Sequence, residues 1–77
     1  MTHKQARISK GFARQQCEAF AEDFGMEMQG NVQTVTISDG TTTVEMALSS
    51  RRFSNKTTGE SGDWFNARAC LMRQFKK

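Results

Sequence analysis

Basic side chains gather at the amino-terminal end of the sequence, where no carboxylate accompanies them. The first sixteen residues hold four cations and no acid, namely Lys4, Arg7, Lys10 and Arg14. All eight acidic residues lie between positions 18 and 63, although the net charge of the chain is +3. Clustered lysine and arginine side chains neutralise phosphates and release the counterions around a nucleic acid. The pattern therefore predicts an anionic partner for this end of the chain.

A second cationic group lies in the polar segment 49–62 and includes an aromatic ring. It consists of Arg51, Arg52, Phe53 and Lys56. An exposed aromatic ring beside arginines can stack on a base or anchor a protein interface. The alternative, of equal weight, is that Phe53 folds back and closes the edge of a thin core. Together with the amino-terminal cations, these four residues are the predicted binding residues.

The residue types that catalysis and metal binding require are scarce. The single histidine, His3, has no second ligand at a recognised spacing. The sequence has no tyrosine, no glycine-rich phosphate loop after a strand, and no nucleophile with a base at a plausible spacing. Glu18, Glu22 and Asp23 indicate a solvated helix face more than a catalytic carboxylate pair. We therefore predict a binding protein that is no enzyme and uses no metal or cofactor.

No disulfide is expected, because the sequence has only two cysteines, Cys17 and Cys70, and no apolar amino-terminal run that could serve as a signal peptide. Cys70 is expected on the outer side of a helix, as a small surface residue or, alternatively, a reactive thiol. No apolar stretch approaches the ~20 residues that span a bilayer. We expect a cytoplasmic protein without a membrane partner. Its length is typical of a complete accessory protein of a phage or a bacterium.

Two segments have helical periodicity. In 9–24 the apolar residues recur at intervals of three and four, with Ser9 as the amino-terminal cap and Gly25 as the end. The second helix is predicted over 63–75 and is capped by Ser61 or Asp63. The apolar residues expected to face the core from these helices are Phe12, Ala13, Cys17, Phe20, Phe24, Trp64, Ala67, Leu71 and Phe75, with Phe65 and Met72 at the edge.

Asp39-Gly40 predicts a tight hairpin turn, because a two-residue turn needs positive φ at both central positions. The predicted pairs are Ser38 with Thr41, Ile37 with Thr42, Val35 with Val44, and Gln33 with Met46. A slip by one residue would mix the two faces of this hairpin. Its apolar face holds Val35, Ile37, Val44, Met46 and Leu48, and its polar face holds Thr34, Thr36, Thr43 and Glu45.

A third strand is predicted before the hairpin. Gly30-Asn31 offers another tight turn, which would place Met26 opposite Val35 and Met28 opposite Gln33. The polar segment 49–62 is predicted to be a mobile loop. The fold class is therefore α+β: a helix, a two- or three-stranded antiparallel meander and a helix, with both helices packed on one face of the sheet. With three strands the helices run parallel, and the basic clusters of the two chain ends separate.

The element order of helix, three strands and helix is similar to that of the double-stranded RNA-binding domain, over most of the chain. That family opens its second helix with a lysine-rich motif that grips phosphates. Here the opening is Gly59-Glu60-Ser61-Gly62-Asp63, whose negative charge repels a phosphate backbone. The resemblance is thus one of element order, and we do not assign the chain to the family.

Residues 1–77 are expected to form one domain with a basic tail, 1–8. Two functions remain open. The chain is a nucleic-acid-binding accessory protein, or it is a phage-type small protein that binds and inhibits or adapts a host protein complex. In the second case the polar loop, the sheet edge or the acidic patch is the contact surface. A thin core without disulfides also favours a homodimer.

Overall fold

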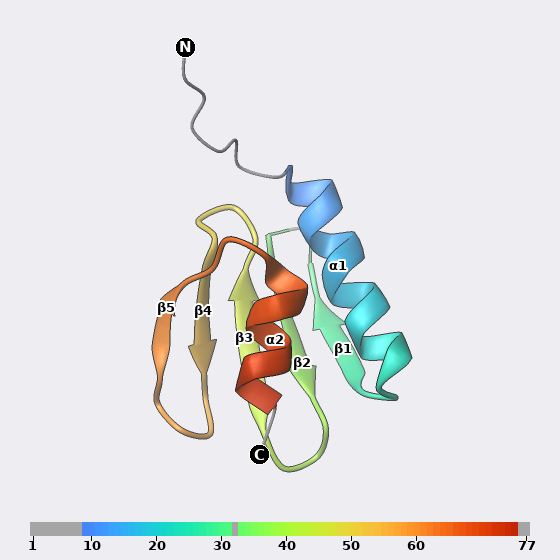
Figure 1. Cartoon of the computed structure of the whole chain (residues 1–77), viewed down its shortest axis with the longest axis vertical. Helices are drawn as coiled ribbons and strands as arrows, with labels where there is room; N and C mark the ends of the chain where they lie inside the picture. Colours follow the sequence, from blue (N-terminus) through green and yellow to red (C-terminus); the bar gives the residue numbers. More distant parts are fainter. Residues whose placement is uncertain (1–8, 32, 76–77) are drawn as a thin grey trace.

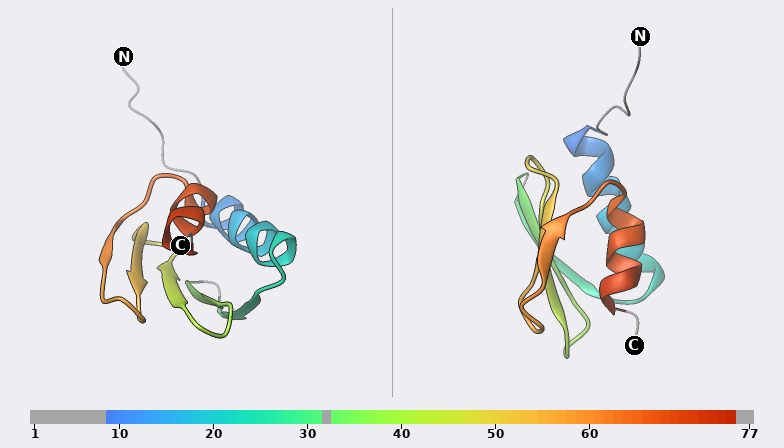
Figure 2. Two further views of the ribbon diagram at one scale, coloured as in Figure 1. Left: turned by 60° about the horizontal axis from the view of Figure 1, so that its bottom comes forward. Right: turned by 60° about the vertical axis from the view of Figure 1, so that its left-hand side comes forward.

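Two helices and five strands make up the computed structural model, which describes residues 9–31 and 33–75. In chain order the elements are α1 (Lys10–Asp23), β1 (Glu27–Gly30), β2 (Thr34–Ser38), β3 (Thr43–Ala47), β4 (Arg52–Asn55), β5 (Ser61–Asp63) and α2 (Ala67–Phe75). The strands form one antiparallel sheet in the order β1-β2-β3-β4-β5 (Figure 1). Both helices cover the same face, and the other face of the sheet is open (Figure 2). The predicted α+β class and the placement of the helices are confirmed, but the sheet has five strands where two or three were predicted.

Helix α1 begins as predicted at Ser9, whose hydroxyl accepts a hydrogen bond from the Phe12 amide at 3.1 Å. Its buried stripe consists of Ala13, Cys17, Phe20 and Ala21. Phe12 and Phe24 were expected in the core, but 48% and 49% of their surfaces are exposed. Phe12 lies about 100° around the helix from Ala13 and so faces outward. Phe24 is the C-cap residue and lies beyond the regular helix.

The β2–β3 hairpin has the predicted faces but a different register. Ile37 pairs with Val44, and Ser38 pairs with Thr43, so each partner lies two residues later than predicted. The turn is longer because the Asp39 carboxylate accepts hydrogen bonds from the amides of Thr41 and Thr42, at 2.8 and 2.7 Å. A shift of two residues keeps every side chain on its face. The residues predicted for the apolar face are all buried: Val35, Ile37, Val44, Met46 and Leu48.

The predicted third strand exists as β1, again with a different register. Met28 pairs with Ile37, and Gly30 pairs with Val35. The Asn31 side chain accepts hydrogen bonds from the amides of residues 33 and 34, which widens this turn also. Gly30 has a φ of +134°, and a Cβ atom there would lie 2.2 Å from the backbone oxygen of Thr34. A side chain at position 30 is therefore excluded by the close approach of β2.

The prediction of a mobile loop over 49–62 is wrong, because this segment forms β4 and β5. Asn55 is the buried polar residue of the described chain, and its side chain orders the turn between these strands. Its Oδ1 atom accepts hydrogen bonds from the amides of Thr57 and Thr58, each at 3.0 Å. Its Nδ2 atom donates to Oε1 of Gln74 in α2 at 3.0 Å. One amide group therefore closes the turn and ties it to a helix.

Helix α2 begins four residues later than predicted. The Asn66 side chain caps it by accepting a hydrogen bond from the Ala69 amide at 3.0 Å, whereas Ser61 and Asp63 belong to β5. Trp64 is buried ahead of the helix. The prediction that Cys70 faces outward is wrong, because Cys70 and Leu71 both point into the core.

The helices run parallel, as an odd number of strands requires. The Ala67 amide donates to Oε1 of Gln16 at 3.1 Å, and nearer the carboxyl ends of the helices the ring centroids of Phe20 and Phe75 lie 5.7 Å apart. The carboxyl ends of both helices therefore lie at the same end of the domain (Figure 1).

Five strands in place of three also limit the likeness to the double-stranded RNA-binding domain. In that family the opening of the second helix binds phosphates. The corresponding segment of this chain, 59–63, forms strand β5 and the end of the turn before it.

We expect Val35→Asp to unfold the domain. Val35 is fully buried, and an unpaired charge there costs about 3–5 kcal/mol, which is comparable with the whole stability of a small domain. Thr34→Asp, on the open face one residue away, should change the free energy of unfolding by less than ~1 kcal/mol. Urea titration followed by the fluorescence of Trp64 measures both. Equal damage from the two variants would contradict the one-sided sheet.

Asn55→Ala should destabilise the domain by about 1–3 kcal/mol, because it leaves two turn amides and the Gln74 side chain without their partner. Ser54→Ala on the neighbouring, half-buried position is the matched control and should stay near wild type. The midpoint of urea unfolding reports the difference. An Asn55→Ala variant as stable as the control would show that the buried amide does not hold the β4–β5 turn.

Candidate interaction surface

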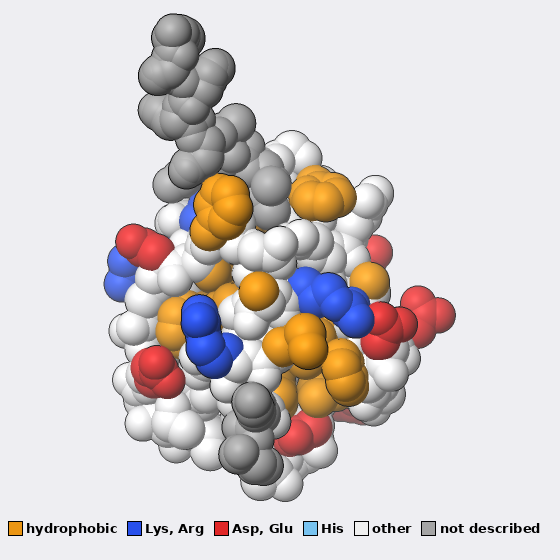
Figure 3. All heavy atoms as spheres, viewed as in Figure 1, with side chains coloured by type: hydrophobic (Ala, Val, Ile, Leu, Met, Phe, Trp, Pro, Cys, Tyr) orange, Lys and Arg blue, Asp and Glu red, His pale blue; other side chains and the backbone are white. Residues whose placement is uncertain are grey.

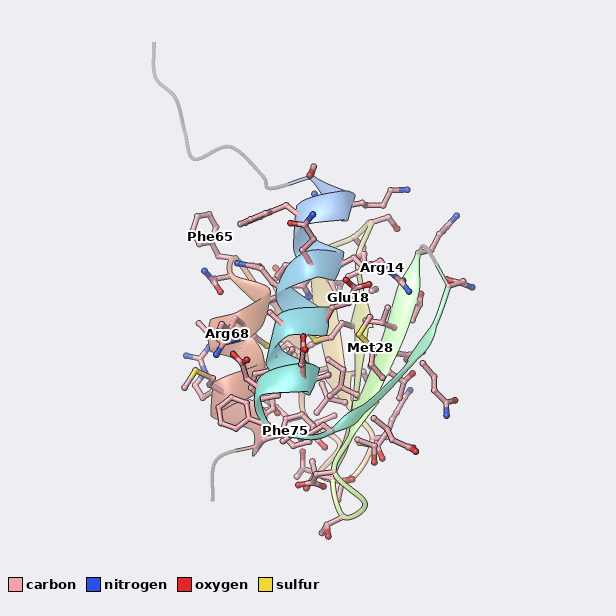
Figure 4. The ribbon with its side chains drawn as sticks, turned by 90° about the vertical axis from the view of Figure 1, so that its right-hand side faces the viewer. Arg14, Glu18, Met28, Phe65, Arg68 and Phe75 are labelled. Atoms are coloured by element: carbon pink, nitrogen blue, oxygen red, sulfur yellow. The ribbon has the colours of Figure 1, made fainter. Side chains whose placement is uncertain are left out.

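Two of the four predicted amino-terminal cations, Lys10 and Arg14, lie among the described residues. Lys4 and Arg7 lie outside the described residues. Lys10 is exposed in the first turn of α1. Arg14 pairs with Glu18 of the same helix at 3.2 Å and donates to the Asn31 carbonyl oxygen, just after β1, at 2.7 Å. Figure 4 shows Arg14 and Glu18 together on this side of the helix. Arg14 therefore supports the fold at the β1–β2 turn.

The second predicted group is divided between the core and the open sheet face. Phe53 is 8% exposed and packs in the core, which confirms the alternative in which it folds back. Arg51 has a φ of +59° and donates to the carbonyl oxygens of Leu48 and Ser49 within the β3–β4 turn. Neither side chain is presented for stacking on a base.

Two further cations of this group are paired with acids on the sheet. Arg52 contacts Asp63 at 2.6 Å across β4 and β5, and Lys56 contacts Glu45 at 3.2 Å. Ser54 shares the open face with Arg52, next to a shallow hollow of about 260 Å³. The structure thus does not unite the two predicted groups, because Lys10 and Arg14 belong to α1 and the others to the sheet.

Large exposed apolar side chains concentrate on the helices. In the described chain these are Phe12, Phe24, Phe65 and Met72, with exposures of 48%, 49%, 66% and 48%. Figure 3 shows hydrophobic side chains at both ends of the face that the helices present. We define the helical face as the surface formed by Phe12, Ala19, Asp23, Phe24, Phe65, Arg68, Ala69 and Met72.

An apolar groove lies at the carboxyl end of the helical face. It has a volume of about 460 Å³ and is lined by Phe20, Phe24, Met26, Met72, Arg73 and Phe75. The rings of Phe20 and Phe24 lie 4.7 Å apart between their centroids. Phe75, labelled in Figure 4, closes the groove from α2. An open groove of aromatic rings and methionine is typical of a surface that accepts another apolar side chain.

One ion pair joins the two helices on the helical face, beside Phe24. Arg68 of α2 contacts Asp23 of α1 at 2.7 Å, and its guanidinium lies 6.0 Å from the centroid of the Phe24 ring. Figure 4 shows Arg68 and Phe65 on the side of α2 away from the sheet. The two charges offset one another, so the face around Phe24 carries little net charge and stays compatible with apolar contacts.

The sequence contained a signal for this surface. Ala13, Cys17, Phe20 and Ala21 already complete a buried stripe, and Phe12 does not share its direction. Phe65 likewise precedes the first helical residue of α2. The prediction that Phe12 and Phe24 lie in the core was wrong because a chain this small cannot cover all of its aromatic side chains.

Across residues 9–31 and 33–75, no group of three or more His, Cys, Asp and Glu side chains gathers around a point that a metal ion could occupy. Neither α1 nor α2 is long and apolar enough to cross a membrane.

Comparison with models of known protein families, with curated proteins and with solved structures gives no match to this chain.

The two thiols are protected by burial. Burial raises the pKa of Cys17 to about 12, against the opposing effect of Arg14, and that of Cys70 to about 11, against the opposing effect of Arg73. Both thiols therefore stay protonated near neutral pH and are poor nucleophiles in the folded protein.

We expect the free energy of unfolding to fall at alkaline pH, because the two thiols ionise more readily in the unfolded chain than in the folded protein. Both folded-state pKa values are raised, so the stabilisation is complete below the unfolded value near 9 and is lost as the pH rises toward 11–12. Urea unfolding between pH 8 and 10.5 measures this loss. The Cys17→Ala/Cys70→Ala variant is the control and should show a shallower decline. Rapid alkylation of either thiol in the folded protein at pH 8 would contradict the burial.

Proposed function

We propose that this chain is a non-catalytic, cytoplasmic protein-binding module whose helical face docks onto a larger protein. The observation that carries the proposal is the exposure of four large apolar side chains on one face, with 48% to 66% of the surface of each in solvent. A single exposed apolar residue needs no explanation, but several on one face are typical of an interaction surface.

The composition of the helical face suits a protein partner. Aromatic rings act as anchors that lose little conformational entropy, and Met72 adapts to the shape of its partner. The groove beside Phe24 offers a pocket for an apolar side chain of that partner. The Arg68–Asp23 pair supplies polar groups that fix orientation without a large excess charge.

Nucleic acid is the rival partner, and the side-chain contacts weigh against it. Arg14, Arg52 and Lys56 each lie within 3.2 Å of a carboxylate oxygen. A phosphate would have to displace that carboxylate before gaining from the cation. Such pairs reduce the counterion release on which binding to nucleic acid depends.

Site-specific photo-crosslinking tests the proposal. A photoreactive phenylalanine analogue replaces Phe65 in one form of the protein and Thr36, on the open sheet face, in a matched control. After irradiation in the cells that produce the protein, we expect a discrete protein adduct from position 65 and none from position 36. Mass spectrometry identifies the adduct.

Titration against DNA and RNA at two salt concentrations completes the test. Salt-dependent binding that weakens when Lys4, Arg7, Lys10 and Arg14 become serine would instead support the nucleic-acid function. Adducts from position 36 alone would place the interface on the sheet, and either result would overturn the proposal.

A further inference from the structure

We propose that Met72 is an oxidation site, at which a hydroperoxide converts the thioether to a sulfoxide and thereby weakens the binding of apolar groups in the groove. The inference assigns a chemical modification to the chain itself. It rests on the proposed function only where it extends to the larger partner, and there it gives the helical face a means of regulation.

The exposure of the sulfur-bearing side chains singles out Met72. This side chain is 48% exposed on the helical face. Susceptibility to oxidation follows exposure and, for a thiol, its thiolate character. A hydroperoxide that meets the folded domain therefore reaches Met72 first. The other sulfur-bearing side chains of residues 9–31 and 33–75 are buried, or partly buried against the core: Cys17, Met26, Met28, Met46 and Cys70.

The reaction needs only the thioether and the hydroperoxide. A lone pair of the Met72 sulfur attacks the outer oxygen of the hydroperoxide, the O–O bond breaks, and that oxygen becomes bonded to sulfur. The sulfur is oxidised, and hydrogen peroxide is reduced to water. A flexible apolar side chain is thereby replaced by a polar one, and sulfoxide reductases can reverse the change.

The new oxygen atom lies at the apolar groove. Met72 lines this groove of about 460 Å³ together with Phe20, Phe24 and Phe75. A thioether packs well against aromatic rings and adapts to an apolar group beside it. A sulfoxide oxygen is a hydrogen-bond acceptor that an apolar group leaves unsatisfied, so covering it costs free energy. The oxidised groove therefore binds apolar groups more weakly.

Arg68 offers the sulfoxide a hydrogen-bond donor at the surface. Arg68 and Met72 are four residues apart in α2, so their side chains are neighbours on the helix. The Arg68 guanidinium lies 2.7 Å from Asp23 and 6.0 Å from the ring centroid of Phe24, and it carries further N–H groups. Because Met72 is not part of the core cluster, its oxidation changes the groove and leaves the fold intact.

Peptide mapping by mass spectrometry during treatment with hydrogen peroxide tests the site. We expect Met72 to be converted about fivefold faster than Met26 and Met28, and Met46 to be converted last, because exposure falls in that order. Circular dichroism confirms that the protein oxidised at Met72 is folded. Conversion of Met72 no faster than that of Met26 or Met28 would overturn the assignment.

Titration with the neutral fluorescent probe N-phenylnaphthylamine measures the groove. Oxidation of the wild type should raise the dissociation constant of the probe about tenfold, and reduction by methionine sulfoxide reductases should restore it. Met72→Leu, of similar volume and without sulfur, is the matched control and should stay within about twofold before and after the same treatment. An untreated groove that binds no probe would overturn the inference, and so would an equal loss of affinity in Met72→Leu.

Photo-crosslinking from position 65, with and without hydrogen peroxide, separates the inference from the proposed function. We expect the yield of the adduct to fall on oxidation in the wild type and to stay constant in Met72→Leu. An adduct whose yield does not fall in the wild type would overturn the regulation and leave the proposed function standing. The absence of any adduct would overturn the larger partner, whereas the mapping and the probe titration would still decide the oxidation site.

Discussion

The side-chain amide of Asn55 joins the polar segment 49–62, whose composition is typical of a loop, to helix α2. Its oxygen closes the turn between β4 and β5, and its nitrogen bonds to Gln74 of α2. A buried amide must find partners for its donors and acceptors, because each unsatisfied group is costly. That requirement stabilises the end of β4 and ties α2 to the sheet, in addition to the burial of Ala67, Cys70 and Leu71. The helical face exists because α2 is held beside α1.

The parts of the fold that the sequence predicts are those determined by burial. Val35, Ile37, Val44 and Met46 alternate with polar residues, and this alternation survives a turn that is two residues longer than expected. Registers were wrong because the side chains of Asp39 and Asn31 cap turn amides, an effect that depends on local geometry. The two extra strands were missed because polar composition hid the inward direction of Phe53 and Asn55.

The candidate surface was harder to predict than the fold, for a physical reason. Ion pairs such as Arg52 with Asp63 join residues 11 apart, and only strand pairing reveals that these charges offset one another. The charge pattern of the sequence therefore overstated the cationic character of the folded protein. Conversely, the exposure of Phe12 and Phe65 depends on how many apolar side chains a thin core can hold, which the pattern of a single helix does not show.

The meander has a kinetic consequence. Every strand pairs with its neighbour in the sequence, so the sheet can assemble from successive hairpins, each of which closes a short loop. The contact between α1 and α2 is different, because Gln16 and Ala67 are separated by 51 positions. The entropy lost on closing so long a loop is recovered only once the sheet has brought its ends together. The helices should therefore join late in folding, so that the surface through which the protein meets other molecules is completed in the last step.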